Sequence, residues 1–162
     1  MRCSASEMEE DMGILNVASG KSLYRGYEYA KEKKVLSLDE IDDGIYQGIV
    51  SGSNGEAYEI FLDVAHPRRS KCNCPHANGK MIVCKHIAAA YFTAYPMEAD
   101  QYIKELEEYW EEEEARQQKQ GEQLVRYVRS MKKAELQEAL LQLLYEGPDW
   151  QYERFIRYHL EV

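Results

Sequence analysis

Long apolar runs are missing from this sequence of 162 residues. A membrane-spanning helix needs roughly 18–20 consecutive apolar residues, and no run approaches that length. The first residues, MRCSASEMEEDMGIL, also lack the order of basic and then apolar residues that is typical of a secretion signal. We therefore expect no membrane partner and a location in the cytoplasm.

A complete phosphate-binding loop is missing as well. The stretch ASGKS at residues 18–22 matches only the end of such a loop, whose motif requires another glycine five positions before Gly20. That position holds Leu15, which excludes a nucleotide site of this type. We expect no small-molecule substrate.

Cysteine is scarce and unevenly distributed. Three of the four cysteines and two of the four histidines fall within KCNCPHANGKMIVCKH, residues 71–86. In reducing cytoplasm, clustered cysteines more often bind a metal or act in catalysis than form disulfides. Cys72 and Cys74 form one pair, Cys84 and His86 form another, and nine residues separate the pairs. Three thiolates and one imidazole make a closed tetrahedral shell for Zn²⁺, so we predict one structural zinc ion.

Other interpretations of the cluster fit the residues less well. A disulfide between Cys72 and Cys74 is strained, because side chains alternate across an extended backbone; thiol redox chemistry and a metal-free site stay open as minor alternatives. A catalytic zinc keeps an open position, whereas four donors are available here and no glutamate accompanies them. We therefore expect a protein that is not an enzyme. His76 is an alternative ligand that we expect instead in a solvent-facing loop, and we expect Cys3 to be a free thiol.

The order Cys-x-Cys, nine residues, Cys-x-His resembles the SWIM zinc finger. Pro75, Lys85 and the run IAAAYF after CKH resemble this family too, as does SLYRGYEYAKEKKV with the two strand-like stretches after it. The chain is similar in particular to small bacterial proteins that carry one such finger and continue into a helical tail. The resemblance covers residues 18–95 well and the tail loosely. It implies a ββα module that binds one zinc ion, with DNA or a protein as its partner.

Periodicity indicates the elements before the cluster. Leu23, Tyr24 and Tyr27 recur at helical spacing and predict a helix from Lys21 to about Glu32, and VLSL predicts a short strand. IYQGIVS and AYEIFLDV alternate with period two around GSNGE, which predicts a hairpin with two glycines at positive φ. These glycines are Gly52 and Gly55. On the second strand the side chains expected to face the core are those of Tyr58, Ile60, Leu62 and Val64.

Helical patterns follow the cluster. CKHIAAAYFTAY predicts a helix from Cys84 that ends before Pro96, and its expected buried stripe is Ile87, Ala90, Tyr91 and Ala94. A second helix is predicted to about Gln118, with a break at Gly121 and further short helices with buried faces beyond it. A stop and a start are expected at Gly147 and Pro148. The run Glu111–Glu114 is expected on a solvated face, with Glu112 paired to Arg116.

The predicted fold class is α+β, with a small antiparallel sheet and a helix forming a ββα zinc module, followed by a helical C-terminal tail. Residues 1–17 are expected to form an acidic, flexible N-terminus and residues 18–95 the zinc-finger domain. Residues 96–162 are expected to form a helical region that packs on the finger or docks beside it.

Charge bears on the partner. The net charge is −9, and residues 92–162 carry nine basic and sixteen acidic residues, which disfavours nucleic acid for the tail because phosphate binding needs cations. Residues 21–91 are different, since nine of their ten basic residues lie in two clusters that can form a positive patch. The clusters are Arg25, Lys31, Lys33 and Lys34, and Arg68, Arg69, Lys71, Lys80 and Lys85. We predict an interaction module that binds DNA or protein; the alternative is an adaptor or scaffold that uses its helical tail, and a zinc-dependent enzyme is a remote third.

Overall fold

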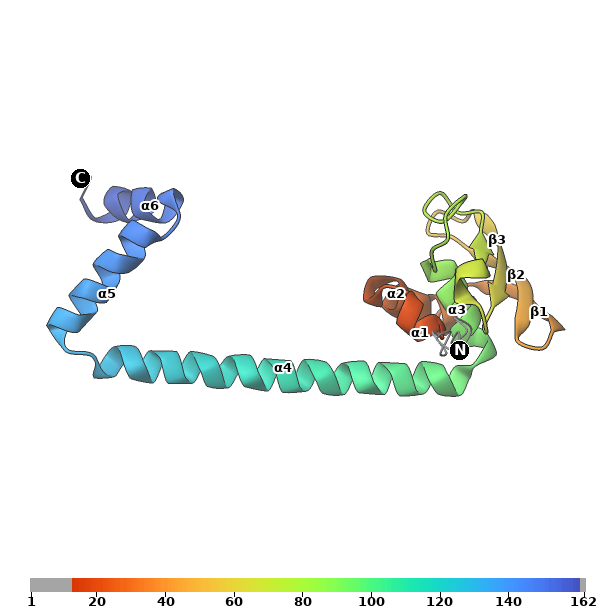
Figure 1. The fold of residues 1–162 in the computed structure, drawn as a ribbon, viewed down its shortest axis with the longest axis horizontal. Helices are drawn as coiled ribbons and strands as arrows, with labels where there is room; N and C mark the ends of the chain where they lie inside the picture. The colour runs from red at the N-terminus through yellow and green to blue at the C-terminus, as the bar shows by residue number, and fades with distance from the viewer. Residues whose placement is uncertain (1–12, 161–162) are drawn as a thin grey trace, which may run out of the picture. The chain divides into compact units, whose positions relative to one another are not determined.

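The structure is a computed structural model that describes residues 13–160. It divides into two compact units that meet between Glu108 and Tyr109, here called the N-terminal and the C-terminal unit, and Figure 1 shows the ribbon of each. Cys3, for which we expected a free thiol, lies outside the described residues, as does most of the acidic N-terminal segment.

A four-stranded antiparallel sheet forms one layer of the N-terminal unit. Its strands lie in chain order: β1 (Val35–Asp42), β2 (Ile45–Ser51), β3 (Ala57–Asp63) and β4 (Lys71–Cys72). β4 pairs with the middle of β3 at the sheet edge, where Cys72 lies opposite Ile60. This sheet and the helices confirm the predicted α+β class. β1 extends well beyond the expected VLSL, because its pairing with β2 continues to Asp42.

The side chains of β3 alternate between the two faces of the sheet, as predicted. Ile60 and Leu62 are buried, and Tyr58 and Val64 are partly buried against the same core. Phe61 alternates with them and lies on the opposite, more open face. One face therefore carries the core, and the other is more open.

Helix α3 (Lys85–Ala94) packs between the sheet and helix α2 (Gly20–Lys31). We expected one buried stripe on α3, but every side chain from His86 to Phe92 is buried, because α2 also contacts this helix. The helices approach closely at Gly26, where a Cβ would lie 2.5 Å from the Cβ of Ala88. Ala94, which we placed in the stripe, is only half-buried.

Two short elements frame this core. Helix α1 (Ile14–Val17) places Ile14 in it with no exposed surface, so the flexible N-terminus expected through residue 17 is wrong for its last residues. The apolar side chains of α1 explain the difference, since Ile14 is buried in the core and Leu15 and Val17 pack against it. The 3₁₀ helix η1 (Pro67–Arg69) precedes β4.

The turn between β2 and β3 differs in detail from the expectation. Gly55 has a φ of 83°, as predicted, but Gly52 does not have a positive φ. Gly52 is instead restricted by space, because a Cβ there would lie 2.5 Å from the ring of Tyr58. Its role is close packing.

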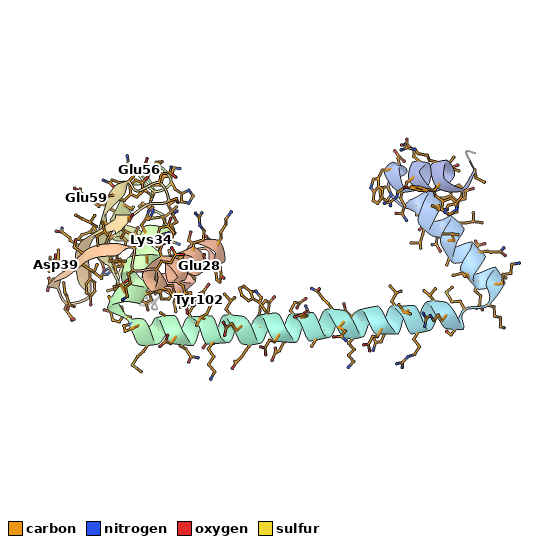
Figure 2. All side chains as sticks on the ribbon, turned by 180° about the vertical axis from the view of Figure 1, so that it is seen from behind. Glu28, Lys34, Asp39, Glu56, Glu59 and Tyr102 are labelled. Atoms are coloured by element: carbon orange, nitrogen blue, oxygen red, sulfur yellow. The ribbon has the colours of Figure 1, made fainter. Side chains whose placement is uncertain are left out.

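Helix α4 (Pro96–Ser130) begins directly after α3. Its first turns belong to the N-terminal unit, where Ala99 is buried and the ring of Tyr102, labelled in Figure 2, lies 5.3 Å from that of Phe92. Pro96 cannot continue α3, but it suits the first position of the next helix, where no amide hydrogen bond is lost.

The C-terminal unit consists of the rest of α4 with α5 (Lys133–Glu146) and α6 (Asp149–His159). The break predicted at Gly121 is wrong: α4 continues through it, because one glycine among good helix formers costs only about 1 kcal/mol. The predicted stop at Gly147 is confirmed, and Pro148 is the N-cap of α6.

The predicted buried faces are also absent from this unit. Among its described residues only Leu144 is buried, and Figure 2 shows side chains on all sides of α4. Fifteen large apolar side chains are exposed: Tyr109, Trp110, Leu124, Val125, Tyr127, Val128, Leu136, Leu140, Leu141, Leu143, Tyr145, Trp150, Tyr152, Tyr158 and Leu160.

Across residues 13–160, no helix combines the length and the apolar character needed to cross a membrane.

Candidate metal centre

The corner between β3 and β4 brings the first two cysteines to the sheet edge. The Asp63 backbone N–H donates to the Ser70 hydroxyl at 3.0 Å, and the Asp63 carboxylate accepts the His66 backbone N–H at 2.8 Å. Asp63 and Ser70 are both buried. After this corner, Cys72 completes β4, and Cys74 follows in the next turn.

The second pair lies at the start of α3. Cys84 is the N-cap of this helix, and His86 lies in its first turn. The local sequence places them there, because Val83 is buried next to the cap and IAAA continues the helix into the core. The helix N-terminus carries a partial positive charge, which favours a thiolate at this position.

These two segments bring four side chains together. The ligand atoms of Cys72, Cys74, Cys84 and His86 all lie within 4.8 Å of one another, and all four residues are buried. Nδ1 of His86 lies 3.6 Å from the sulfur of Cys72 and 3.9 Å from that of Cys84. Tetrahedral Zn²⁺ bonds of about 2.3 Å to sulfur and 2.0 Å to nitrogen imply a separation of roughly 3.5 Å, so the donors have the spacing that one zinc ion requires.

Hydrogen bonding prepares one thiol of the cluster for metal binding. The Cys72 thiol lowers the pKa of Cys84 by hydrogen bonding to its sulfur, and hydrogen bonds with His86 and with the backbone N–H of Ile87 act in the same direction. The pKa of Cys72 is raised, because it donates to Cys84. Since zinc binds thiolates, a favoured Cys84 thiolate reduces the number of protons that binding must displace.

Aromatic rings surround the histidine. The ring of Tyr58 lies 4.7 Å from that of His86, and the ring of Tyr29 lies 5.7 Å away. Among the described residues, Nε2 of His86 is buried without a hydrogen-bond partner. Nδ1 is the ring nitrogen near the sulfurs of Cys72 and Cys84, so it is the one that an ion bound by these sulfurs can reach.

A comparison with protein families agrees with this geometry. Residues 55–95, from the β2–β3 turn to the end of α3, match the family model of the SWIM zinc finger. Over this segment the chain is similar to the SWIM zinc finger. The match confirms the predicted family but is shorter than the expected 18–95. Neither the curated proteins nor the solved structures include a match to this chain. The finger and its buried Cys72, Cys74, Cys84 and His86 cluster fit one structural zinc ion.

His76 lies in the exposed loop between the two ligand pairs of the finger and does not belong to the cluster. Lys85, which the sequence assigns to the second basic cluster, has defined partners. Its ammonium donates to the hydroxyl groups of Tyr29 at 2.6 Å and Ser53 at 2.9 Å, and it lies 4.4 Å from the Tyr29 ring centroid. This lysine therefore ties α3 to α2 and to the β2–β3 turn.

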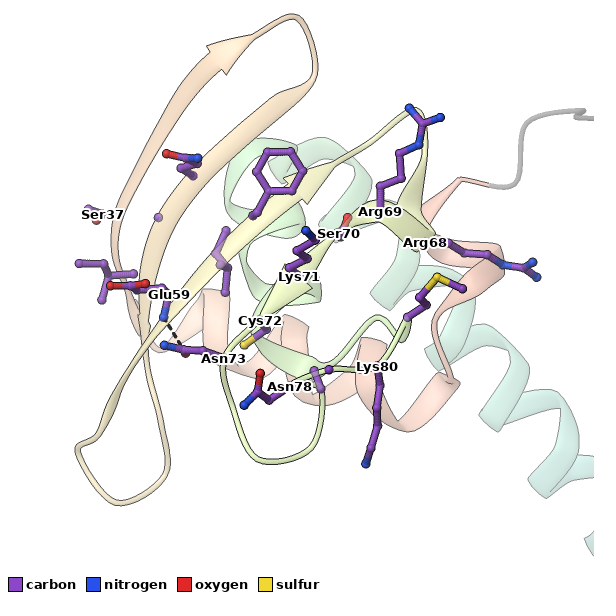
Figure 3. A pocket seen from close by; sticks show the side chains of 18 of the residues that line it. Ser37, Glu59, Arg68, Arg69, Ser70, Lys71, Cys72, Asn73, Asn78 and Lys80 are labelled. Carbon is purple, nitrogen blue, oxygen red and sulfur yellow. Dashed lines mark hydrogen bonds between the residues drawn. The ribbon is translucent and has the colours of Figure 1, made fainter.

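The structure separates the second basic cluster. Four of its members, Arg68, Arg69, Lys71 and Lys80, line a groove of about 1190 Å³ on the sheet face that Phe61 occupies, and Figure 3 shows them around it. Lys85 lies elsewhere, in a second cavity with Arg25. Of the first cluster, Lys34 forms an ion pair with Glu32 at 2.5 Å, while Lys31 and Lys33 are exposed and line neither cavity.

Periodicity did not reveal the groove, because residues from all four strands form it together with residues of the loop between Cys74 and Cys84, here called the zinc loop. Asn73 and Asn78 also line it, and Asn73 accepts the backbone N–H of Glu59 at 3.0 Å. The only sequence signal was the basic run around η1.

Proposed function

We propose that the finger is a nucleic-acid-binding module in which a structural zinc holds the basic groove in shape. The observation that carries this proposal is that Arg68, Arg69, Lys71 and Lys80 line the same groove. None of the four forms an ion pair within the described residues. Cations without internal partners are the groups that replace condensed counterions on nucleic-acid phosphates.

The other residues of the groove suit an extended, single-stranded nucleic acid. Phe61 is half-buried on the groove face and offers a ring on which a base can stack. The amides of Asn73 and Asn78 can hydrogen bond to base edges. Asp39 and Glu59 line the groove from β1 and β3 and repel phosphate, which directs the backbone of the strand to the η1 and zinc-loop side.

Zinc serves this function as a structural element. When bound, the ion joins the end of β4 to the start of α3 and fixes the zinc loop, which carries Asn78 and Lys80, against the sheet. Four protein donors also fill the coordination shell of the zinc ion and leave no open position for a substrate, which favours a binding function over catalysis. The chemistry of recognition comes from the cations, the ring and the amides of this chain.

A titration of labelled single- and double-stranded DNA at two salt concentrations tests the proposal. We expect saturable binding to the single strand that weakens steeply with salt. The slope of log K against log salt reflects the number of phosphate contacts, so in Lys71→Ala and in Lys80→Ala its magnitude should fall by the amount that corresponds to about one contact. The matched control Lys31→Ala should keep the original slope. Absence of binding at low salt, or equal losses in all three variants, would contradict the groove as the interface.

A second candidate function, a scaffold formed by the tail, is favoured by the exposed apolar side chains of the C-terminal unit. Trp110, Leu124 and Val128 share one face of α4, since they are separated by 14 and 4 residues. On the same helix Glu111–Glu114 and the later Arg126 and Arg129 carry opposite charges. An antiparallel second copy of this chain would place these two charge groups side by side.

Sedimentation equilibrium of the full chain tests this second role. We expect a dimer that dissociates in Leu124→Lys and stays intact in Lys119→Ala, a control on the same helix. A monomer at all concentrations would rule out a second copy as the partner, without bearing on the nucleic-acid groove.

A further inference from the structure

We propose that the second cavity of the N-terminal unit is a binding site for a phosphate group, separate from the groove. The cavity has a volume of about 500 Å³ and shares no lining residue with the groove. Three cations line it, and they come from two helices: Lys21 and Arg25 from α2, and Lys85 from α3.

Cations outnumber the carboxylates that line this cavity. Within the described residues none of the three cations forms an ion pair. The single carboxylate in the lining is that of Glu56, which already accepts a hydrogen bond from the hydroxyl of Tyr58. Cys74, Cys84 and His86 of the zinc cluster line the cavity as well, and three thiolates with one Zn²⁺ leave about −1 there. Three cations exceed this charge and that of Glu56, so the cavity keeps a net positive charge that attracts an anion.

Lys85 is held in place before any ligand arrives. Its ammonium group donates to Tyr29 and Ser53 and lies over the Tyr29 ring, while a third N–H is left for a ligand. Because these contacts restrict the side chain, less conformational entropy is lost on binding than for a free lysine. The cation is therefore positioned, whereas most surface lysines are not.

Hydrogen-bond donors complete the cavity. Ser19, Ser22 and Ser53 line it, and Ser19 is the N-cap of α2, a helix of 12 residues without an acidic residue in its first turn. The Ser19 hydroxyl donates to the Ser22 hydroxyl at 3.0 Å and accepts the Ser22 backbone N–H at 3.2 Å. The dipole of such a helix end favours phosphate. His86, which is 3% exposed and whose Nε2 has no partner among the described residues, also contributes to the lining.

The arrangement fits a phosphate better than a carboxylate, because several cations and hydroxyl groups converge from the segments 19–25, 53–58 and 74–86. A phosphate offers three or four acceptor oxygens to such donors, and a carboxylate offers only two. The phosphate can belong to a free phosphate compound or to a nucleic-acid backbone.

An NMR titration of the zinc-loaded full chain with inorganic phosphate tests the site, with sulfate at matched ionic strength as the reference anion. We expect saturable shifts of the amide signals of Gly20, Lys21, Ser22 and Ser53, and weaker effects from sulfate. Arg25→Ala should raise the Kd for phosphate about ten-fold, the loss of one charge-assisted hydrogen bond. Lys31→Ala, on the same helix but outside the cavity, should leave the Kd unchanged.

Absence of saturable shifts, or equal losses in Arg25→Ala and Lys31→Ala, would overturn the site. A short oligonucleotide then identifies the source of the phosphate. If the oligonucleotide competes with inorganic phosphate and this competition is lost in Arg25→Ala, the site binds a backbone phosphate. If Arg25→Ala leaves the oligonucleotide affinity unchanged while the original protein binds inorganic phosphate, the site binds a free phosphate compound. Lys71→Ala should not alter the phosphate titration, so the site and the groove fail independently.

Discussion

The two units of this protein gain their structure in different ways. In the N-terminal unit a sheet, α3 and α2 form successive layers, and four ligands meet inside them. In the C-terminal unit the helices leave nearly every apolar side chain exposed, and only Leu144 is buried among residues 109–160. The first unit depends on long-range contacts and a metal, and the second depends on local helix propensity. Perturbations should therefore affect the units separately.

Zinc removal should show the largest difference between the units. Binding of structural zinc contributes about 10–16 kcal/mol near neutral pH, which exceeds the roughly 5–15 kcal/mol of net stability of a typical domain. We expect a strong chelator to abolish the thermal transition of the N-terminal unit. Far-UV circular dichroism should retain the helical signal of α4 to α6. An unchanged transition in protein shown to be metal-free would contradict the structural role.

A ligand substitution should have the next largest effect. Cys84→Ser replaces a thiolate at the buried start of α3, and we expect a loss of several kcal/mol in the free energy of unfolding together with loss of stoichiometric zinc. His76→Ala changes an exposed loop residue of the same segment and should alter stability by less than about 0.5 kcal/mol. Denaturant unfolding with metal analysis measures both, and equal effects would assign His76 to the shell.

Two glycine-to-alanine substitutions provide a matched test, because they should change stability in opposite directions. In Gly26→Ala the new Cβ meets Ala88 between the packed helices α2 and α3, so we expect a destabilisation of about 1–3 kcal/mol. In Gly121→Ala nothing lies within 4 Å of the new Cβ inside α4, and we expect a stabilisation of about 0.5–1 kcal/mol. Thermal melting of each unit is the measurement. A loss of stability in Gly121→Ala would mean that a partner approaches α4 there.

The smallest effect concerns the ion pair on α4. Arg116 pairs with Glu113, three residues earlier, and not with Glu112 as predicted from the i,i+4 spacing. Hydrogen bonding from Arg116 lowers the pKa of Glu113 below the ordinary value of a glutamate in an unfolded chain. The stabilisation is thus present above that value and is lost as pH falls through the lower folded pKa.

Titration of α4 helicity between neutral and acidic pH checks this small effect. Glu113→Gln should remove a slight acid-dependent loss of helix signal, whereas Glu112→Gln should retain it. Identical titrations of the two variants would show that the exposed pair has no measurable influence on the helix, a common result for surface ion pairs.

Much of the N-terminal unit could be predicted from local pattern. The spacing of Cys72, Cys74, Cys84 and His86 indicated zinc, and the alternation of β3 indicated its buried face. The burial of α3 on all sides could not be predicted, because it depends on α2 packing at Gly26, far away in the sequence. Gly52 was misinterpreted for a related reason: its constraint is the ring of Tyr58, and a turn motif does not contain that ring.

The sequence by itself determined the metal chemistry, since donor type and spacing are local properties that survive in any fold that closes the loop. It also determined that the tail is helical, because helix propensity and periodicity act within a few residues. Only the tertiary structure decided which cations lie together. It placed Arg68, Arg69, Lys71 and Lys80 around one groove and joined Lys85 to Lys21 and Arg25 in another cavity. Such groupings arise when strands and helices distant in sequence pack around a common core, and no local pattern encodes them.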